Sequence, residues 1–190
     1  MSELLEKILS KGNMNSAYKR VCANKVAGGV DDVTVEQLGD YIRENWNGIR
    51  EQIRHREYKP QPVRRVEIPK PNGGVRELGI PTVMDRVIQQ GIVQVISPMC
   101  EPLFSEWSYG FRPNRSCEMA IRQLLIYLNE GYEWIVDIDL EKFFDNVPQD
   151  RLMSLDHDII NDGDMEISHM HFIGSITSNI FWKSIIPFIK

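Results

Sequence analysis

Residues 134–145 read Trp134-Ile135-Val136-Asp137-Ile138-Asp139-Leu140-Glu141-Lys142-Phe143-Phe144-Asp145, and acidic and apolar residues alternate along the first part of this stretch. In a β-strand, successive side chains point to opposite faces, so Asp137 and Asp139 would share one face and the apolar residues at even positions the other. Such alternation is typical of an antiparallel strand with one buried and one solvated face. The stretch therefore predicts an antiparallel strand that presents two neighbouring acids.

The two acids suggest a metal site. Carboxylates this close repel each other unless a cation lies between them. A divalent metal ion with oxygen ligands, which keeps coordination sites for water and substrate phosphate, suits such a pair. A strand with two solvated acids and no ligand is the alternative, and these residues alone do not decide between the two.

Length and composition set limits on the class of protein. The 190 residues allow one domain or two small ones, with enough apolar residues for a core. No apolar run is long enough to span a bilayer, and residues 1–3 lack the features of a signal peptide. We therefore expect a cytoplasmic protein without a membrane partner. The three widely spaced cysteines are expected to be reduced thiols.

The charge distribution favours an anionic partner, although the net charge is −5. Between Arg50 and Arg76, eight basic residues stand against three acids. A basic stripe in an acidic protein is the usual electrostatic sign of a nucleic-acid surface. A solvated charged helix face would give the same count, so this alternative stays open.

Local signals predict mostly helices and one β-hairpin. Apolar spacing and capping residues predict helices at 3–10 and 14–26, a long helix from Thr34, a buried helix around 84–96 that Pro98 kinks or ends, and a helix that Ser116 caps and Gly131 closes. Asn72-Gly73 between two β-capable runs predicts a hairpin whose tip carries Lys70 and Arg76. These cations suit a polyphosphate, although charged hairpin edges also discourage aggregation.

Three motifs in this order resemble a known family. They are Ile68-Pro69-Lys70-Pro71-Asn72-Gly73-Gly74 with the following Arg76 and Leu78-Gly79-Ile80-Pro81-Thr82, then Tyr109-Gly110-Phe111-Arg112-Pro113, then Asp137-Ile138-Asp139 with Phe143-Phe144-Asp145. The chain is similar, over roughly residues 12–155, to the fingers and early palm of a reverse transcriptase encoded by a bacterial group II intron, also called a maturase. The motifs at this spacing are far more specific together than any one alone.

The resemblance implies roles for individual residues. Asp139 would be the catalytic acid that binds Mg²⁺, with the Leu140 carbonyl also touching the metal ion. Asp137, on the same face, is the rival for this role, but the spacing to Phe144 favours Asp139, so that Asp137 would be a partner of the ligands rather than a ligand. Lys70, Arg76 and Phe144 would bind the incoming dNTP, Phe144 as the ring that excludes a ribose 2′-hydroxyl.

The resemblance also implies partners. The partners would be template and intron RNA and a DNA primer, with Lys25, Arg64, Arg65 and Arg112 contacting RNA. Residues 24–34 would form a loop that covers the template; Asp32 stands where the family usually has glycine.

The implied fold is α+β: the fingers and an incomplete palm of a right-hand polymerase, mainly helical with a β-hairpin and a short antiparallel palm sheet. Residues 1–130 would be the fingers, 131–155 the start of the palm, and 156–190 a divergent tail. The 190 residues contain no Tyr-x-Asp-Asp motif, which supplies the family's second acidic cluster.

We therefore expect this chain to be inactive by itself and to expose apolar surface through which it could form a homodimer. An RNA-binding maturase module without polymerase chemistry is the alternative. A metal-dependent nuclease or phosphatase ranks last, because too few further acids or histidines stand near Asp139.

Overall fold

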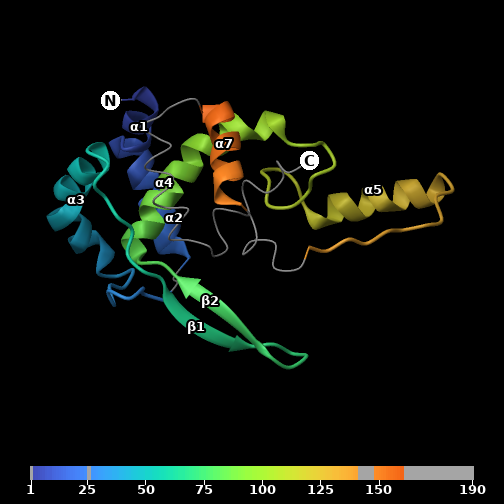
Figure 1. Ribbon diagram of the computed structural model, residues 1–190, viewed down its shortest axis with the longest axis horizontal. Coiled ribbons are helices and arrows are strands. Elements are labelled where there is room, and N and C mark those ends of the chain that lie inside the picture. The colour runs from blue at the N-terminus through green and yellow to red at the C-terminus, as the bar shows by residue number, and fades with distance from the viewer. Residues whose placement is uncertain (1, 25–26, 141–147, 161–190) are drawn as a thin grey trace.

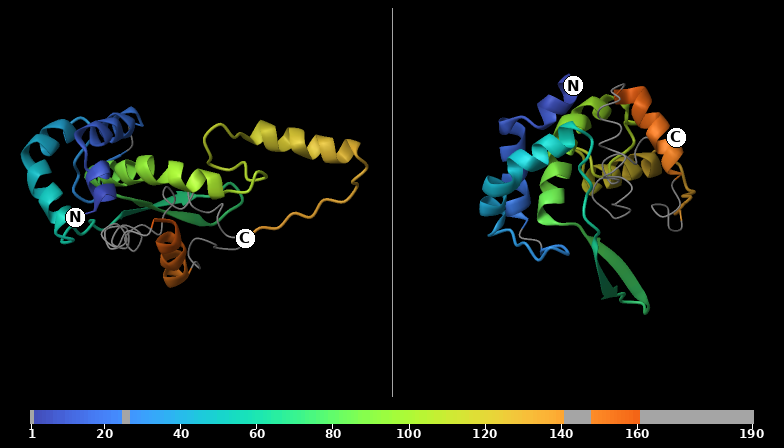
Figure 2. Two further views of the ribbon diagram at one scale, coloured as in Figure 1. Left: turned by 90° about the horizontal axis from the view of Figure 1, so that it is seen from above. Right: turned by 60° about the vertical axis from the view of Figure 1, so that its left-hand side comes forward.

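The computed structural model describes residues 2–24, 27–140 and 148–160. Helices α1 to α4 and α7 form a body from which two arms extend, a β-hairpin and the helix α5 with the segment that follows it (Figures 1 and 2). The predicted α+β class, mainly helical with a hairpin, is confirmed at this level.

The N-terminal helices begin at serine caps. Helix α1 spans Glu3–Ile8 and α2 spans Lys11–Ala23; the hydroxyl oxygens of Ser2 and Ser10 accept hydrogen bonds from backbone N–H groups in the first turns. A side-chain acceptor at this position satisfies an amide that has no partner within the helix. Both helices lie close to the expected ranges, which confirms that prediction.

Helix α3 spans Leu38–Arg54 and so begins four residues after Thr34. The predicted capping pair makes only one of its two bonds: the Thr34 N–H donates to the Gln37 side chain at 3.0 Å. Residues 35–37 form turns instead of helix. The predicted start at Thr34 is therefore wrong, although the local interaction that suggested it exists.

Helix α4, Val83–Cys100, is the centre of the body, and α1, α2, α3 and α7 all pack against it. Twelve of its residues are buried, from several sides of the helix, as expected of a helix that other elements surround. The helix continues two residues beyond Pro98, so this proline does not end it. Helix α7, Gln149–Ile160, adds Ile160 to the same core.

The hairpin forms as its turn signal predicts. Strand β1, Arg64–Pro69, pairs antiparallel with β2, Val75–Ile80, in a register that joins Pro69 to Val75. Gly73 and Gly74 have φ values of 82° and 85°, a region that glycine enters without a steric cost. All residues of β1 are exposed, so the hairpin extends into solvent rather than packing on the body.

The prediction of a palm strand in the stretch that begins at Trp134 is wrong. Helix α5, Cys117–Asn129, begins at the Ser116 cap as expected, but residues 132–140 are not assigned to a strand, and β1 and β2 form the only sheet among the described residues. Trp134 and Val136, expected on a buried face, are 90% and 81% exposed. A strand needs a neighbouring backbone for its hydrogen bonds, and the described residues offer none to this segment.

Three further observations concern the predictions from length and composition and the predicted domain boundary. The expected boundary between residues 155 and 156 falls within α7, and the domain division itself remains a prediction. Cys22, Cys100 and Cys117 form no disulfide bond, as expected of reduced thiols. Within the described ranges, the helices are all too short or too polar to be candidates for crossing a membrane.

A buried carboxylate joins the hairpin to the body. Asp85, 1% exposed, accepts hydrogen bonds from the Tyr58 hydroxyl at 2.7 Å, the Gln61 N–H at 3.1 Å and the Thr82 hydroxyl at 2.6 Å. Tyr58 and Gln61 belong to the connection between α3 and β1, whereas Thr82 is the N-cap of α4. Burial raises the pKa of Asp85, and the three donors partly oppose that shift.

The loop before α3 lies against the same end of α4. A Cβ atom on Gly29 would lie 2.6 Å from the Thr82 Cα, closer than atoms can approach without a backbone shift. The Arg86 guanidinium also donates to the Ala27 carbonyl at 2.5 Å. The first turn of α4 therefore positions both the loop and the base of the hairpin.

We predict that Gly29→Ala lowers the free energy of unfolding by about 2 kcal/mol, as overpacking usually does. Gly48→Ala is the matched control: it lies inside α3 with no atom within 4 Å of the added Cβ, and it should stabilise the protein by up to about 1 kcal/mol. Urea unfolding measures both values. Equal effects of the two variants would contradict the close approach of Gly29.

The raised pKa of Asp85 makes a prediction about pH. The folded state holds this proton more tightly than the unfolded state, so the favourable contribution is complete below the ordinary value of 3.8 and is lost as pH rises through the raised pKa. In Asp85→Asn, an amide turned with its oxygen towards Gln61 and Thr82 and its nitrogen towards Tyr58 keeps all three bonds. The stability of this variant relative to the natural chain should therefore increase between pH 4 and 7.

The control for that measurement is Asp40→Asn, which removes a charge from an exposed position of α3. Urea unfolding at several pH values compares the three proteins. A stability difference between Asp85→Asn and the natural chain that is the same at every pH would contradict the prediction.

Candidate functional site

The hairpin tip presents Lys70 to solvent. The Lys70 N–H donates to the Gly74 carbonyl at 3.0 Å and the Gly73 N–H donates to the Lys70 carbonyl at 3.2 Å, so the turn fixes the backbone of this residue. Its side chain is exposed. Arg76 lies opposite Ile68 in β2, two residues from the turn. The predicted arrangement of these two positions near one tip is therefore present in the backbone.

The arginines at the base of the hairpin differ in how firmly they are held. Arg64 donates to Asp32 at 3.1 Å and lies within 3.5 Å of the Gly29 carbonyl, so it ties β1 to the loop before α3. The Arg65 side chain is 80% exposed, and its only ion pair among the described residues is with Glu77 at 4.0 Å. Exposed pairs of this kind contribute little, so Arg65 can turn towards an anionic partner.

The loop predicted to cover the template includes Lys25, which lies outside the described residues. Asp32, which replaces the family's usual glycine, has a φ of 53°. Aspartate enters this left-handed region at a lower cost than most residues, and its carboxylate also pairs with Arg64. The substitution is therefore compatible with the glycine-like backbone that the position requires.

The predicted metal ligands lie on the other arm. Asp139 and Leu140, with Asp137 as the predicted partner beside them, are exposed in the segment after α5, and Phe144 lies outside the described residues. No ion pair joins either acid to Lys70 in the ranges that the structure describes. Those ranges also hold no group of three or more acids, histidines or cysteines that could bind a metal ion. The predicted apposition of the metal ligands and the triphosphate ligands across a bound nucleotide therefore stays a prediction.

Two exposed carboxylates and a backbone carbonyl are oxygen donors, which is the chemistry that Mg²⁺ requires. They fit a metal ion that phosphate oxygens and water would complete. They do not by themselves form a two-metal site.

Arg112 has a structural environment. Its guanidinium donates to Glu101 at 2.8 and 3.1 Å and to the carbonyl oxygens of Ser105 and Ser108 at 2.5 and 3.1 Å, and it lies 4.9 Å from the centre of the Phe104 ring. The side chain is only 6% exposed. Arg112 therefore forms a salt bridge within its own loop, and contact between Arg112 and RNA would require this network to open.

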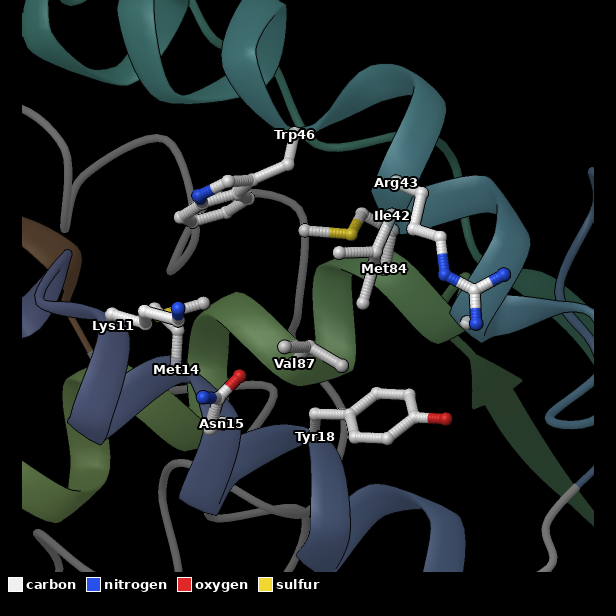
Figure 3. A pocket seen from close by; sticks show the side chains of 10 residues that line it. Lys11, Met14, Asn15, Tyr18, Ile42, Arg43, Trp46, Met84 and Val87 are labelled. Carbon is white, nitrogen blue, oxygen red and sulfur yellow. The ribbon is translucent and has the colours of Figure 1, made fainter.

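Sequence reasoning missed one candidate site, a cleft between α2 and α3 over α4 (Figure 3). Trp46 and Ile42 line it from α3. Both belong to the apolar stripe of this helix, whose helical spacing predicts only core packing: Leu38, Ile42, Trp46, Ile49 and Ile53. The signal was available in part, since Trp46 is the one large aromatic residue of that stripe. The sequence does not specify the distance between α2 and α3, and this distance decides whether the Trp46 side chain is covered.

Comparison with known proteins identifies the family. Residues 68–173 match the family described as "Reverse transcriptase (RNA-dependent DNA polymerase)". This range includes the hairpin turn with Lys70, strand β2 with Arg76, the Arg112 loop and both acids, and it extends past residue 155.

Curated relatives point the same way. The chain is similar to Protein YkfC of Escherichia coli, with 38% identity over 66% of this chain and 34% of that protein. It is also similar to the "Group II intron-encoded protein LtrA" of Lactococcus lactis, with 35% identity over 73% of this chain and 23% of LtrA. A third is "Nuclear intron maturase 1, mitochondrial" of Arabidopsis thaliana, with 30% identity over 43% and 11%.

The chain thus spans about a third or less of the length of these relatives. More than half of its residues match the family, in a range that carries the cationic hairpin and the paired acids predicted to bind nucleotide and metal. This chain belongs to the reverse transcriptase family, and its relatives include proteins encoded by group II introns.

Proposed function

We propose that this chain is the N-terminal part of an RNA-directed DNA polymerase that copies intron RNA with Mg²⁺ and deoxynucleoside triphosphates. The observation that carries the proposal is the family match across residues 68–173, which joins the hairpin of Lys70 and Arg76 to the acids of residues 137–139. The fold would correspond to the fingers and part of the palm of a right-hand polymerase.

Asp139, the Leu140 carbonyl and substrate phosphate oxygens would hold the Mg²⁺ ion. When bound, this ion lowers the pKa of the primer hydroxyl and neutralises phosphate charge. Lys70 would supply a point charge to the triphosphate, and the exposed cations of the hairpin would follow the RNA backbone. Asp137 and Asp139 are the two acids of residues 137–139, and by themselves they are too few for a two-metal site. The chain alone is therefore proposed to bind substrate without catalysis.

The second candidate is an RNA-binding maturase module without polymerase chemistry. The exposed cations of the hairpin favour it, because they need no metal ion to contact phosphate. Similarity to a protein named as a nuclear intron maturase also supports it. The two candidates differ in whether Asp139 contributes to ligand binding.

We predict that Asp139→Ala abolishes Mg²⁺-dependent binding of a fluorescent deoxynucleoside triphosphate, whereas Asp137→Ala retains it. Both residues are exposed on the same segment, so they form a matched pair with equal loss of charge. Fluorescence anisotropy with and without Mg²⁺ measures the binding. Equal loss of nucleotide binding in both variants would mean that the negative charge of the segment, and not Asp139 itself, is what matters. RNA binding that needs no metal ion, without nucleotide binding, would favour the second candidate.

Primer extension tests the proposed inactivity of this chain. An RNA template, a DNA primer, Mg²⁺ and all four deoxynucleoside triphosphates should yield no processive product. Continuous DNA synthesis by the 190-residue chain would contradict the expectation that Asp137 and Asp139 are insufficient for catalysis.

A further prediction follows from the different environments of Arg65, whose side chain is exposed, and Arg112, whose side chain is largely buried. Arg65→Gln should weaken binding to single-stranded RNA several-fold and reduce the slope of log affinity against log salt by about one, without a change in stability. Arg112→Gln should instead lower the free energy of unfolding by about 2 kcal/mol, because it removes bonds to Glu101. Filter binding at several salt concentrations and urea unfolding separate the two roles, and the opposite pattern would contradict both.

Self-association through α5 is also part of the proposal. Every residue of α5 is at least partly exposed, and Leu125 and Leu128 are 52% and 42% exposed. An apolar surface of this extent usually marks an interface. Leu125→Glu should therefore shift sedimentation equilibrium towards monomer, whereas Gln123→Glu on the same helix should not. A natural chain that is monomeric at all concentrations would contradict the homodimer.

A further inference from the structure

Helices α2 and α3 both pack on α4, but they leave a cleft between them of about 260 Å³. Met84 and Val87 of α4 form its floor, Met14 and Tyr18 line the α2 wall, and Trp46 lines the α3 wall (Figure 3). We call this space the α2–α3 cleft. Its walls are mostly apolar, with a few polar groups at the edge, which is the usual composition of a binding site.

The apolar stripe of α3 shows that the cleft is an interruption in core packing. Leu38 and Ile49, towards its two ends, are buried, at 0% and 9% exposure. Ile42 and Trp46, which lie between them on the same stripe, are only partly buried. Two neighbouring apolar side chains that are partly exposed between buried ones, one of them a large aromatic, indicate a surface that another group can cover.

The charged groups at the edge of the cleft indicate the kind of ligand that it can bind. Lys11 and Arg43 are the charged members of the lining, which contains no acidic residue. Arg43 pairs with Asp40, but both side chains are more than 70% exposed, so this pair is weak and can open. A cationic edge above an aromatic wall suits a ligand with a flat ring and an attached phosphate.

The volume limits the ligand further. Sites for drug-sized molecules usually measure about 300–1,000 Å³, so this cleft is suited to a single ring system. Proteins recognise single-stranded RNA by stacking unpaired bases on aromatic side chains while cations contact the adjoining phosphates. A base stacked on the Trp46 indole would place its phosphate near Lys11 or Arg43.

We infer that the α2–α3 cleft binds one unstacked base of single-stranded RNA, with Trp46 as the stacking surface and Lys11 as a phosphate contact. The inference rests on the RNA binding proposed above and adds a second contact site, on the helical body rather than on the hairpin. The site needs neither a metal ion nor the acids of residues 137–139.

Trp46→Ala tests the stacking contact. The probe is a short oligouridylate that contains one 2-aminopurine, whose fluorescence decreases when the base stacks on an aromatic ring. The variant should weaken binding about five- to a hundred-fold and abolish the fluorescence decrease, and Trp46→Phe should restore most of both. Trp107→Ala is the control, since Trp107 is also partly exposed but lies next to Tyr127, outside the cleft.

Lys11→Gln provides a test that cannot be confused with a loss of folding. Lys11 and Lys19 are both exposed on α2, but only Lys11 lines the cleft. Lys11→Gln should therefore reduce affinity and salt dependence more than Lys19→Gln, with no change in unfolding midpoint for either variant.

The outcomes separate this inference from the proposed function. If the natural chain binds RNA and Trp46→Ala and Lys11→Gln behave like their controls, the cleft inference is wrong and RNA binding stands. If the natural chain binds no RNA, the proposed function fails as well. If Trp46→Ala reduces self-association without changing RNA affinity, a second copy of the chain covers the cleft, which also overturns the inference.

Discussion

The carboxylate of Asp85 is the constraint on which the position of the hairpin relative to the helical body depends. A buried charge is costly unless donors replace the water that it loses. Here the donors come from two stretches of chain, Tyr58 and Gln61 before the hairpin and Thr82 at the start of α4. The end of α3, the beginning of β1 and the N-terminus of α4 therefore cannot move independently. The same turn of α4 contacts Gly29, so the loop before α3 is held at this point too.

Elements whose signals are local could be predicted from the sequence. The hairpin depends on two glycines that accept positive φ values, and α5 depends on the Ser116 hydroxyl at its first turn. In both cases, the residues that decide the geometry lie within a few positions of each other. The start of α3 shows the limit of this approach, because the bond between Thr34 and Gln37 forms without extending the helix.

Features that depend on distant partners could not be predicted in this way. Residues 134–140 have the alternation of a half-buried strand, but alternation specifies only which side chains share a face. It does not supply the neighbouring backbone that makes a strand. The environment of Arg112 could not be predicted for a related reason: an arginine beside an aromatic residue is compatible with an RNA surface, and the sequence does not show that Glu101 pairs with it. The candidate site residues thus follow from motifs, whereas their juxtaposition requires contacts outside those motifs.

The α2–α3 cleft has a structural cause that no helical pattern reveals. Asn13 of α2 donates to the carbonyl oxygens of Ile8 and Gly91, and Gln94 donates to Asn13 in return. A Cβ on Gly91 would lie 2.8 Å from the Met14 sulfur, so glycine at this position allows α2 to lie close to α4. The buried residues of α3 are Leu38, Ile49 and Ile53, towards the two ends of its stripe. Both α2 and α3 pack on α4, and between them the middle of the α3 stripe stays partly exposed at Ile42 and Trp46.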